Sequence, residues 1–222
     1  MRLHPEEPLA GPWHVEPLVE VFEQVLGIQR LPRLAVVAID GRSSAGKTSL
    51  AARASAVLPN SSVVHTDDVA WHSSAFHWTQ LLVEGVLEPA RGGGRVSYRP
   101  AAWDERSRGD SIEIPAGTRL LLLEGVGASR RELRGFLDGA LWVQTDLDEA
   151  LARDRVRVAA GEIGPEAYEA WMAEETEFIA DQRPWEHANL VIAGSSCDVP
   201  MQPNEVLVAE PHRADAGSER AR

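Results

Sequence analysis

The feature that most constrains this chain is a glycine-rich loop between a buried strand and a helix. The loop runs from Gly41 to Thr48 and reads Gly-x-x-x-x-Gly-Lys-Thr, which fits the phosphate-binding loop pattern at every position. Residues 34–39 before it form a short apolar run rich in β-branched residues, typical of a strand buried on both faces. Residues 49–57 after it have the pattern of a helix. This strand–loop–helix order is the context that the pattern requires.

Each position of the loop has a physical reason. Glycines let the backbone N–H groups turn inward around a phosphate, and the following helix adds the positive end of its dipole. The Lys47 ammonium can reach the β- and γ-phosphates, and the Thr48 hydroxyl can bind Mg²⁺. We therefore expect ATP and Mg²⁺ as cofactors. The expected nucleotide contacts are Gly41, Ser43, Ser44, Ala45, Gly46, Lys47, Thr48 and Ser49.

Lys47 is also the only lysine in the protein, since the other 21 of its 22 basic residues are arginine. We attribute this excess of arginine to a bias in genome composition. Despite this bias, a lysine occupies the phosphate-binding position, which favours a chemical role for Lys47. A glycine-rich turn that binds nothing is the alternative, and this coincidence argues against it.

Composition excludes several other classes of protein. The 222 residues carry 34 acidic and 22 basic side chains, a net charge of −12, which gives no global attraction to nucleic acid or to anionic membranes. No apolar run is long enough for a membrane-spanning helix. The single cysteine, Cys197, cannot form an internal disulfide, so we expect a reducing, cytoplasmic setting.

Strand-like and helix-like segments alternate along the chain. Strands are expected at residues 34–39, 62–66, 120–123, 140–145 and 190–192, and short strand-like pieces at 96–98 and 111–114. Helices are expected at 15–26, 49–57, 76–87, 130–137 and 147–159, and beyond Pro165. The alternation predicts one α/β domain, residues 1–198, with a parallel sheet covered by helices on both faces. We expect residues 199–222 to form a poorly ordered tail.

Carboxylates follow two of the expected strands. Asp67 and Asp68 come after residues 62–66, and Glu124 follows four consecutive leucines. In an open parallel sheet, groups beyond the carboxyl ends of the strands meet in one crevice. Asp67, Glu124 and the Thr48 hydroxyl are therefore candidates for binding Mg²⁺ or for orienting an attacking hydroxyl. For Asp68, a helix cap or a supporting role is as good an interpretation as catalysis.

These segments together resemble the uridine kinase-like P-loop kinases. The resemblance rests on Gly41–Thr48, on residues 58–68 ending in His-Thr-Asp-Asp, and on Leu123-Glu124-Gly125. The group includes uridine-cytidine, nicotinamide riboside, pantothenate and phosphoribulose kinases, and actinobacterial-type proteins with the stretch His-Thr-Asp-Asp-Val-Ala-Trp-His. The similarity covers about residues 34–193. It implies a P-loop NTPase fold with a mobile lid.

The resemblance also implies roles for individual residues. Asp67 matches the catalytic base of the family, and Glu124 matches the acidic residue near the magnesium. Arg153 and Arg157 fall where such kinases carry the lid, and one or both would neutralise charge on the transferred phosphoryl group. A solvated helix, with Glu149 and Asp154 paired along it, is the alternative for these arginines.

An acceptor pocket is expected from aromatic and arginine side chains after Asp67 and between the two short strands. The candidates for binding the substrate, besides Asp67, are Trp71, His72, Tyr98, Arg99 and Trp103. Rings and guanidinium groups suit a flat base or a sugar, although tryptophans more often pack in a core. The histidines near Asp67 fit no standard zinc spacing.

The sequence thus predicts a kinase that transfers the γ-phosphoryl group of ATP to a hydroxyl of a small, nucleoside-like molecule. Val69-Ala70-Trp71 departs from uridine kinases, which have aromatic residues directly after the aspartate. Another hydroxylated metabolite or an antibiotic is therefore an alternative acceptor. A P-loop ATPase or GTPase switch with a protein partner is the alternative from another class. A homo-oligomer is also compatible with the sequence.

Overall fold

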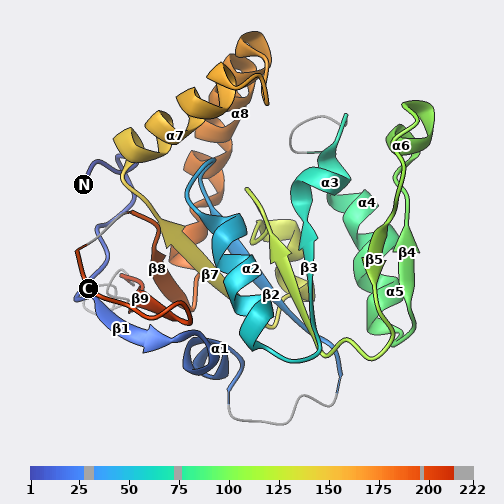
Figure 1. Cartoon of the computed structure of the whole chain (residues 1–222), viewed down its shortest axis with the longest axis horizontal. Helices are drawn as coiled ribbons and strands as arrows, with labels where there is room; N and C mark the ends of the chain where they lie inside the picture. The colour runs from blue at the N-terminus through green and yellow to red at the C-terminus, as the bar shows by residue number, and fades with distance from the viewer. Residues whose placement is uncertain (28–32, 73–76, 196–197, 213–222) are drawn as a thin grey trace, which may run out of the picture.

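A seven-stranded sheet forms the centre of the computed structural model (Figure 1). The structure describes residues 1–27, 33–72, 77–195 and 198–212. The strands are β1 (His14–Pro17), β2 (Ala35–Gly41), β3 (Ser61–His65), β6 (Leu120–Glu124), β7 (Gly139–Gln144), β8 (Leu190–Ala193) and β9 (Glu205–Ala209). Their order across the sheet is β1-β9-β8-β7-β2-β6-β3. The phosphate-binding loop therefore leaves a strand with two parallel neighbours, β6 and β7.

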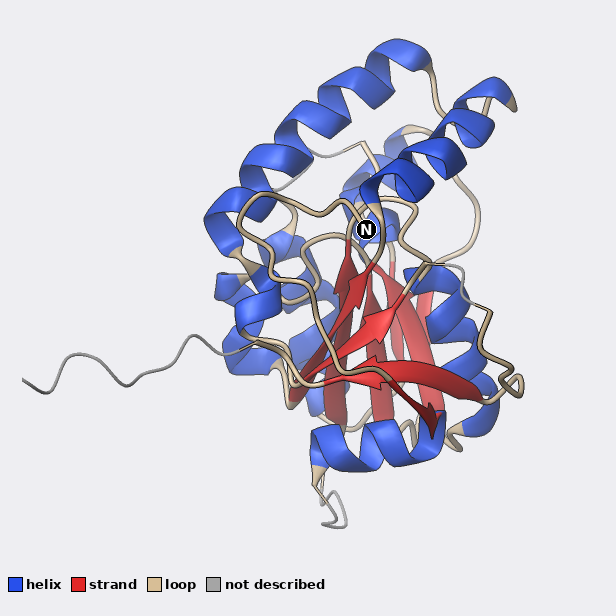
Figure 2. Cartoon of the chain, turned by 90° about the vertical axis from the view of Figure 1, so that its left-hand side faces the viewer, coloured by secondary structure: helices blue, strands red, loops and turns tan. Residues whose placement is uncertain are grey.

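The five strands from β8 to β3 are parallel, whereas β9 pairs antiparallel with both β8 and β1. Two large apolar cores lie on the two faces of the sheet, and a smaller third cluster surrounds Trp142. On β2, Val37 and Ile39 face one core, and Val36 and Ala38 face the other. This division confirms the expected α/β fold with helices on both faces of a largely parallel sheet (Figure 2).

Helices cover these cores in two groups. On one face lie α1 (Leu18–Leu26) and α2 (Lys47–Val57). The other face carries α3 (Thr66–Ala70), the nearly continuous segment α4 (Thr79–Leu82), η1 (Val83–Leu87) and α5 (Glu88–Arg91), and the short 3₁₀ helix η2 (Arg131–Phe136). A small hairpin of β4 (Val96–Tyr98) and β5 (Ile112–Ile114), with α6 (Ala101–Glu105) between its strands, packs beside this second group.

Two long helices, α7 (Leu147–Ala159) and α8 (Pro165–Gln182), extend above the carboxyl ends of the strands (Figure 1). A short 3₁₀ helix, η3 (Pro184–Glu186), connects α8 to β8. The arm formed by α7 and α8 stands where the lid was expected. None of the helices within the described ranges is long and apolar enough to cross a membrane.

Several expected boundaries change. The helix predicted at 15–26 begins at Leu18, because Pro17 and the residues before it pair with β9 as strand β1. The helix predicted at 76–87 is described from Thr79 and reaches Arg91, and Phe76 lies outside the described residues. The helices α3 and α6 were not expected.

The predicted C-terminal boundary is wrong as far as the structure describes the tail. Glu205–Ala209 form β9, which lies between β8 and β1. Val206 and Val208 are buried in the core that also contains Val37 and Ile39. A strand of five residues among prolines and charged residues gives little periodic signal, and its position depends on partners far away in the sequence. The domain therefore continues at least to residue 209.

Candidate active site

The phosphate-binding loop holds its own lysine in place. The Lys47 ammonium is buried and donates to the backbone carbonyl of Arg42 at 2.6 Å. Gly46, directly before α2, has a φ of 98°, a left-handed conformation that glycine adopts without strain. The first turn of α2 then begins at Lys47, so its unpaired N–H groups lie at the loop. This arrangement forms an anion-binding site from backbone and side chain together.

One large pocket, of about 1220 Å³, opens above this loop. Its walls come from the loop and α2, from α3, from the strands β6, β7, β8 and β9, and from the arm of α7 and α8. Of the predicted site residues it contains Ser43, Ser44, Ala45, Gly46, Lys47, Thr48, Ser49, Asp67, Trp71, Glu124, Arg153 and Arg157. Its size suits a nucleotide with a second small molecule beside it. Gly41 lies beneath the loop, where a Cβ would come within 2.9 Å of the Val143 carbonyl.

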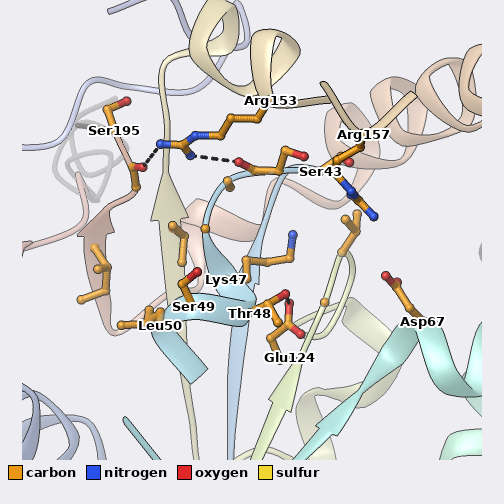
Figure 3. A pocket seen from close by; sticks show the side chains of 18 of the residues that line it. Ser43, Lys47, Thr48, Ser49, Leu50, Asp67, Glu124, Arg153, Arg157 and Ser195 are labelled. Atoms are coloured by element: carbon orange, nitrogen blue, oxygen red, sulfur yellow. Dashed lines mark hydrogen bonds between the residues drawn. The ribbon is translucent and has the colours of Figure 1, made fainter. Parts of the chain in front are cut away.

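Thr48 and Glu124 meet at the floor of the pocket (Figure 3). The Thr48 hydroxyl donates to Oε1 of Glu124 at 3.3 Å, and the other carboxylate oxygen of Glu124 hydrogen-bonds with Nδ1 of His65 at 2.5 Å. The bond to Glu124 raises the pKa of His65. Hydroxyl and carboxylate oxygens are hard ligands, so this pair fits Mg²⁺, which usually takes only one or two protein ligands beside phosphates and water.

Within the described ranges, no group of three or more His, Cys, Asp or Glu forms a metal cage. Gly125 keeps Glu124 at its position. It has a φ of +146°, and a Cβ there would lie 1.8 Å from the Thr66 hydroxyl. A side chain at position 125 would therefore clash with Thr66 at the start of α3, which explains the glycine after Glu124.

Asp67 lies in the first turn of α3 and its side chain is exposed to the pocket, on the side away from Ser195 (Figure 3). Crowding by the pocket walls raises the pKa of Asp67 because it reduces the hydration of the carboxylate. The charge of Glu124 also raises this pKa, and the charge of Lys47 lowers it. Asp67 is thus close enough to both groups for electrostatic coupling.

Asp68 has a different position. Its carboxylate pairs with Arg108 at 2.5 Å, and its backbone carbonyl accepts from the Trp103 indole at 2.9 Å. The Arg108 guanidinium also lies over the Trp103 ring, 3.6 Å from its centroid. Of the interpretations left open for Asp68, the structure favours a supporting role outside the pocket.

The two expected lid arginines differ in their contacts. Arg153 donates to the carbonyls of Ser44 and Gly194, at 3.0 Å each, and also pairs with Glu149. Arg157 pairs with Glu162 at 3.1 Å and extends over the pocket toward Asp67 (Figure 3). Both line the pocket. Arg157 is therefore the better placed of the two to neutralise a charge between Lys47 and Asp67.

The acceptor residues are only partly brought together. Trp71 lines the pocket, and His72 contacts its ring edge-on, with the centroids 4.3 Å apart. Trp103 is 2% exposed and belongs to the core, Tyr98 packs against Gly85, and Arg99 bonds with Asp104 and nearby carbonyls. None of these three lines the pocket. The structure therefore does not bring Tyr98, Arg99 and Trp103 to this pocket, because the hairpin uses them for its own packing, and His72 does not line the pocket either.

Sequence reasoning missed several residues that shape the site. Three buried carboxylates hold the loops of the site: Asp40 near the end of β2, Asp154 on α7 and Glu175 on α8. The pocket also takes walls from residues with no recognisable motif, namely Leu50, Arg53, Ile163, Ala167, Trp171, Ile192, Ala193, Gly194, Ser195, Met201 and Val206. Asp154 and Glu175 stand among many other charged residues of their helices, so the sequence did not mark them as buried.

Comparison with solved structures identifies the same fold elsewhere. A protein described as a possible uridine kinase from Bacillus stearothermophilus is 18% identical, with a TM-score of 0.50 over 78% of this chain and 96% of its own. A protein provisionally named a fructose transport system kinase, from Silicibacter sp. TM1040, is 20% identical, with a TM-score of 0.50 over 77% of this chain and 92% of its own. No protein-family model and no curated protein matches the sequence. The resemblance to uridine kinase-like P-loop kinases is thus confirmed at the level of the fold.

Proposed function

We propose that this chain is a cytoplasmic, magnesium-dependent kinase that transfers the γ-phosphoryl group of ATP to an alcohol group of a small nucleoside-like molecule. One observation carries the proposal: Lys47, the Thr48–Glu124 pair and Asp67 surround a single pocket. These are the groups needed to bind phosphates, to hold a divalent cation and to orient a hydroxyl. The kinase names of the two structural neighbours agree with it.

The loop and the arm supply the charge that phosphoryl transfer needs. Backbone N–H groups at the start of α2 and the Lys47 ammonium would bind the β- and γ-phosphates. Thr48 and Glu124 would hold Mg²⁺, which neutralises charge on the phosphate oxygens when it is bound. Arg157 would add a positive charge from the arm side as charge moves onto the leaving ADP.

Asp67 would act on the acceptor. Its carboxylate would accept a hydrogen bond from the acceptor hydroxyl and take up the proton as the hydroxyl oxygen bonds to the γ-phosphorus. The bond from that phosphorus to the β–γ bridging oxygen breaks, ADP leaves, and Asp67 later returns the proton to solvent. The raised pKa of Asp67 makes it a stronger base than an ordinary aspartate.

The acceptor class is proposed from the resemblance and from Trp71, which lines the pocket together with Ala70 and Asp67. An aromatic ring there suits a flat base or another planar group. A different hydroxylated metabolite or an antibiotic would use the same chemistry. A switch that passes phosphate to water would need a protein partner instead.

The test is ADP release from MgATP, measured with nucleosides, nicotinamide riboside, pantothenate and hydroxylated antibiotics as separate acceptors. Asp67→Asn should still bind ATP but transfer the phosphoryl group about 10²-fold or more slowly, the scale for a positioned base. Lys47→Ala should lose both binding and transfer. Asp68→Asn is the matched control, because this neighbouring carboxylate lies outside the pocket, and it should keep most of the activity.

An acceptor-dependent rate that Asp67→Asn abolishes would support the kinase and name its acceptor class. Full activity in Asp67→Asn on a true acceptor would overturn the role of this residue. ATP turnover that needs no acceptor and increases with a protein partner would favour the switch. A wild-type chain that binds no nucleotide would refute the proposal altogether.

A further inference from the structure

The arm of α7 and α8 is fastened to the phosphate-binding loop at two consecutive residues. On α7, Asp154 accepts hydrogen bonds from the hydroxyls of Ser43 and Ser44, at 3.1 and 2.6 Å. From the same helix, Arg153 donates to the Ser44 carbonyl at 3.0 Å. On α8, Glu175 accepts from the Ser43 backbone N–H at 2.8 Å. The arm therefore touches the loop through both backbone and side chains.

Ser44 needs such support. Its φ is 53°, in the left-handed region, although it is not a glycine. That conformation is strained for an ordinary residue and persists only where the surroundings enforce it. The contacts that hold Ser44 come from α7, because Asp154 binds its hydroxyl and Arg153 binds its carbonyl.

The two carboxylates are not themselves a binding site. Asp154 and Glu175 are each 1% exposed, and the cavity that remains beside them measures only about 10 Å³, about the space of one water molecule. Their partners are all donors: the Ser43 and Ser44 hydroxyls and, at 4.0 Å, the Arg157 guanidinium for Asp154, and the Ser43 N–H and the Trp171 indole for Glu175. Acceptors without a proton of their own suit these positions, which explains the acid at each of them.

We propose that Asp154 is a positioning residue that holds the phosphate-binding loop in its nucleotide-ready shape through Ser44, with Glu175 securing Ser43 from the second helix. The arm is then more than a cover for the pocket, because its base shapes the loop on which phosphate binds. The proposal rests on the proposed function, since it assigns the benefit to nucleotide affinity. Its physical source is pre-organisation: a loop already ordered loses less entropy when a phosphate binds.

The experiment compares the effect of one substitution in two backgrounds. Asp154→Ala should weaken the binding of a fluorescent ATP analogue by about tenfold, because it removes a charge-assisted hydrogen bond that holds Ser44 in its strained conformation. In a Ser44→Gly background, the same Asp154→Ala change should alter affinity by less than about twofold, because glycine adopts the left-handed conformation unaided. Asp148→Ala, which removes an exposed carboxylate of the same helix, is the control.

A second readout does not depend on nucleotide. Amide hydrogen exchange of the loop peptide that contains residues 43–46 should be faster in nucleotide-free Asp154→Ala than in wild type. Asp154→Asn should exchange more slowly than the alanine variant, because its Oδ1 can still accept from Ser44. If Asp154→Ala fails to fold by thermal unfolding, Ser44→Ala removes the same hydrogen bond from the loop side and gives the same prediction.

Equal affinity and equal exchange in Asp154→Ala and wild type would overturn the proposal. A tenfold loss that is just as large in the Ser44→Gly background would also overturn it, since Asp154 would then act by another route. If the wild-type protein binds no nucleotide, the proposed function fails, whereas the exchange measurement still decides whether Asp154 orders the loop.

Discussion

Asp40 joins the phosphate-binding loop to the loop that follows Glu124, and replacing it with asparagine tests how this junction is held. Asp40 is the last residue but one of β2 and is 2% exposed. Its Oδ1 accepts the backbone N–H groups of Gly41 and Gly127, at 2.8 and 2.9 Å. Its Oδ2 accepts the backbone N–H of Ser129 at 2.8 Å and the Ser129 hydroxyl at 2.6 Å. The Asp40→Asn substitution changes one of these oxygens to an NH₂ group.

The magnitude follows from counting donors. An asparagine can keep its oxygen toward Gly41 and Gly127, and the Ser129 hydroxyl can rotate to become an acceptor. The Ser129 backbone N–H cannot, so it faces another donor and is left unpaired, which costs about 1–3 kcal/mol in a buried site. The remaining bonds also lose their ionic character. An opposing effect reduces this loss. Burial raises the pKa of Asp40, because the carboxylate loses hydration in the folded protein, and a neutral asparagine would lose less. We expect a net loss of about 2 kcal/mol in the free energy of unfolding.

Urea unfolding of wild type and Asp40→Asn, with the slope of the transition compared, measures this loss. The control is Ser129→Ala, which removes only the hydroxyl donor and should cost about 1 kcal/mol. A lower midpoint at an unchanged slope is the expected result. If Asp40→Asn proves as stable as wild type, the cost of burying the charge outweighs its four hydrogen bonds, and the reasoning is refuted.

Two further predictions concern the hairpin and the end of β6. Hydrogen bonds from Ser111 and Ser97, and the contact with Arg95, lower the pKa of Glu113 to about 2, below that of the unfolded chain. The stability that Glu113 contributes is therefore present above about pH 4.5 and is lost as the pH falls through 2. The thermal midpoints of wild type and Glu113→Gln should converge over that pH range. A constant difference between the two midpoints would contradict this prediction. Gly125→Ala should lower the free energy of unfolding by about 2–4 kcal/mol in urea, because its Cβ would overlap Thr66; an unchanged midpoint would show that β6 and α3 can separate freely.

The sequence predicted the centre of the site because that part is local. Gly41–Thr48 is a continuous segment whose glycines and lysine have positions set by backbone geometry alone. Asp67 and Glu124 could be added because strand ends in a parallel sheet meet at one edge, and the structure places both beside the loop in the same pocket. Their chemical roles stay predictions until the kinase assay is done.

The acceptor side was predicted less well. Aromatic and arginine residues near Asp67 in the sequence were grouped by type, yet Trp71 lines the pocket whereas Trp103 is in the core. Nothing in a short, irregular segment shows which way each side chain faces. The hairpin decides it, by using Arg99 and Tyr98 for contacts of its own.

The α/β class, the phosphate-binding loop and the acids that follow the strands could be predicted from the sequence, because these features depend on periodicity and short spacing. Only the tertiary structure decided that Glu205–Ala209 complete the sheet and that Asp40 and Asp154 hold the loops of the site. Asp154 meets Ser44 across 110 residues, and Asp40 meets Ser129 across 89. The neighbouring residues in the sequence do not show which donors a buried acid will contact. The cost of burying its charge is offset only by donors that folding brings to it from distant parts of the chain.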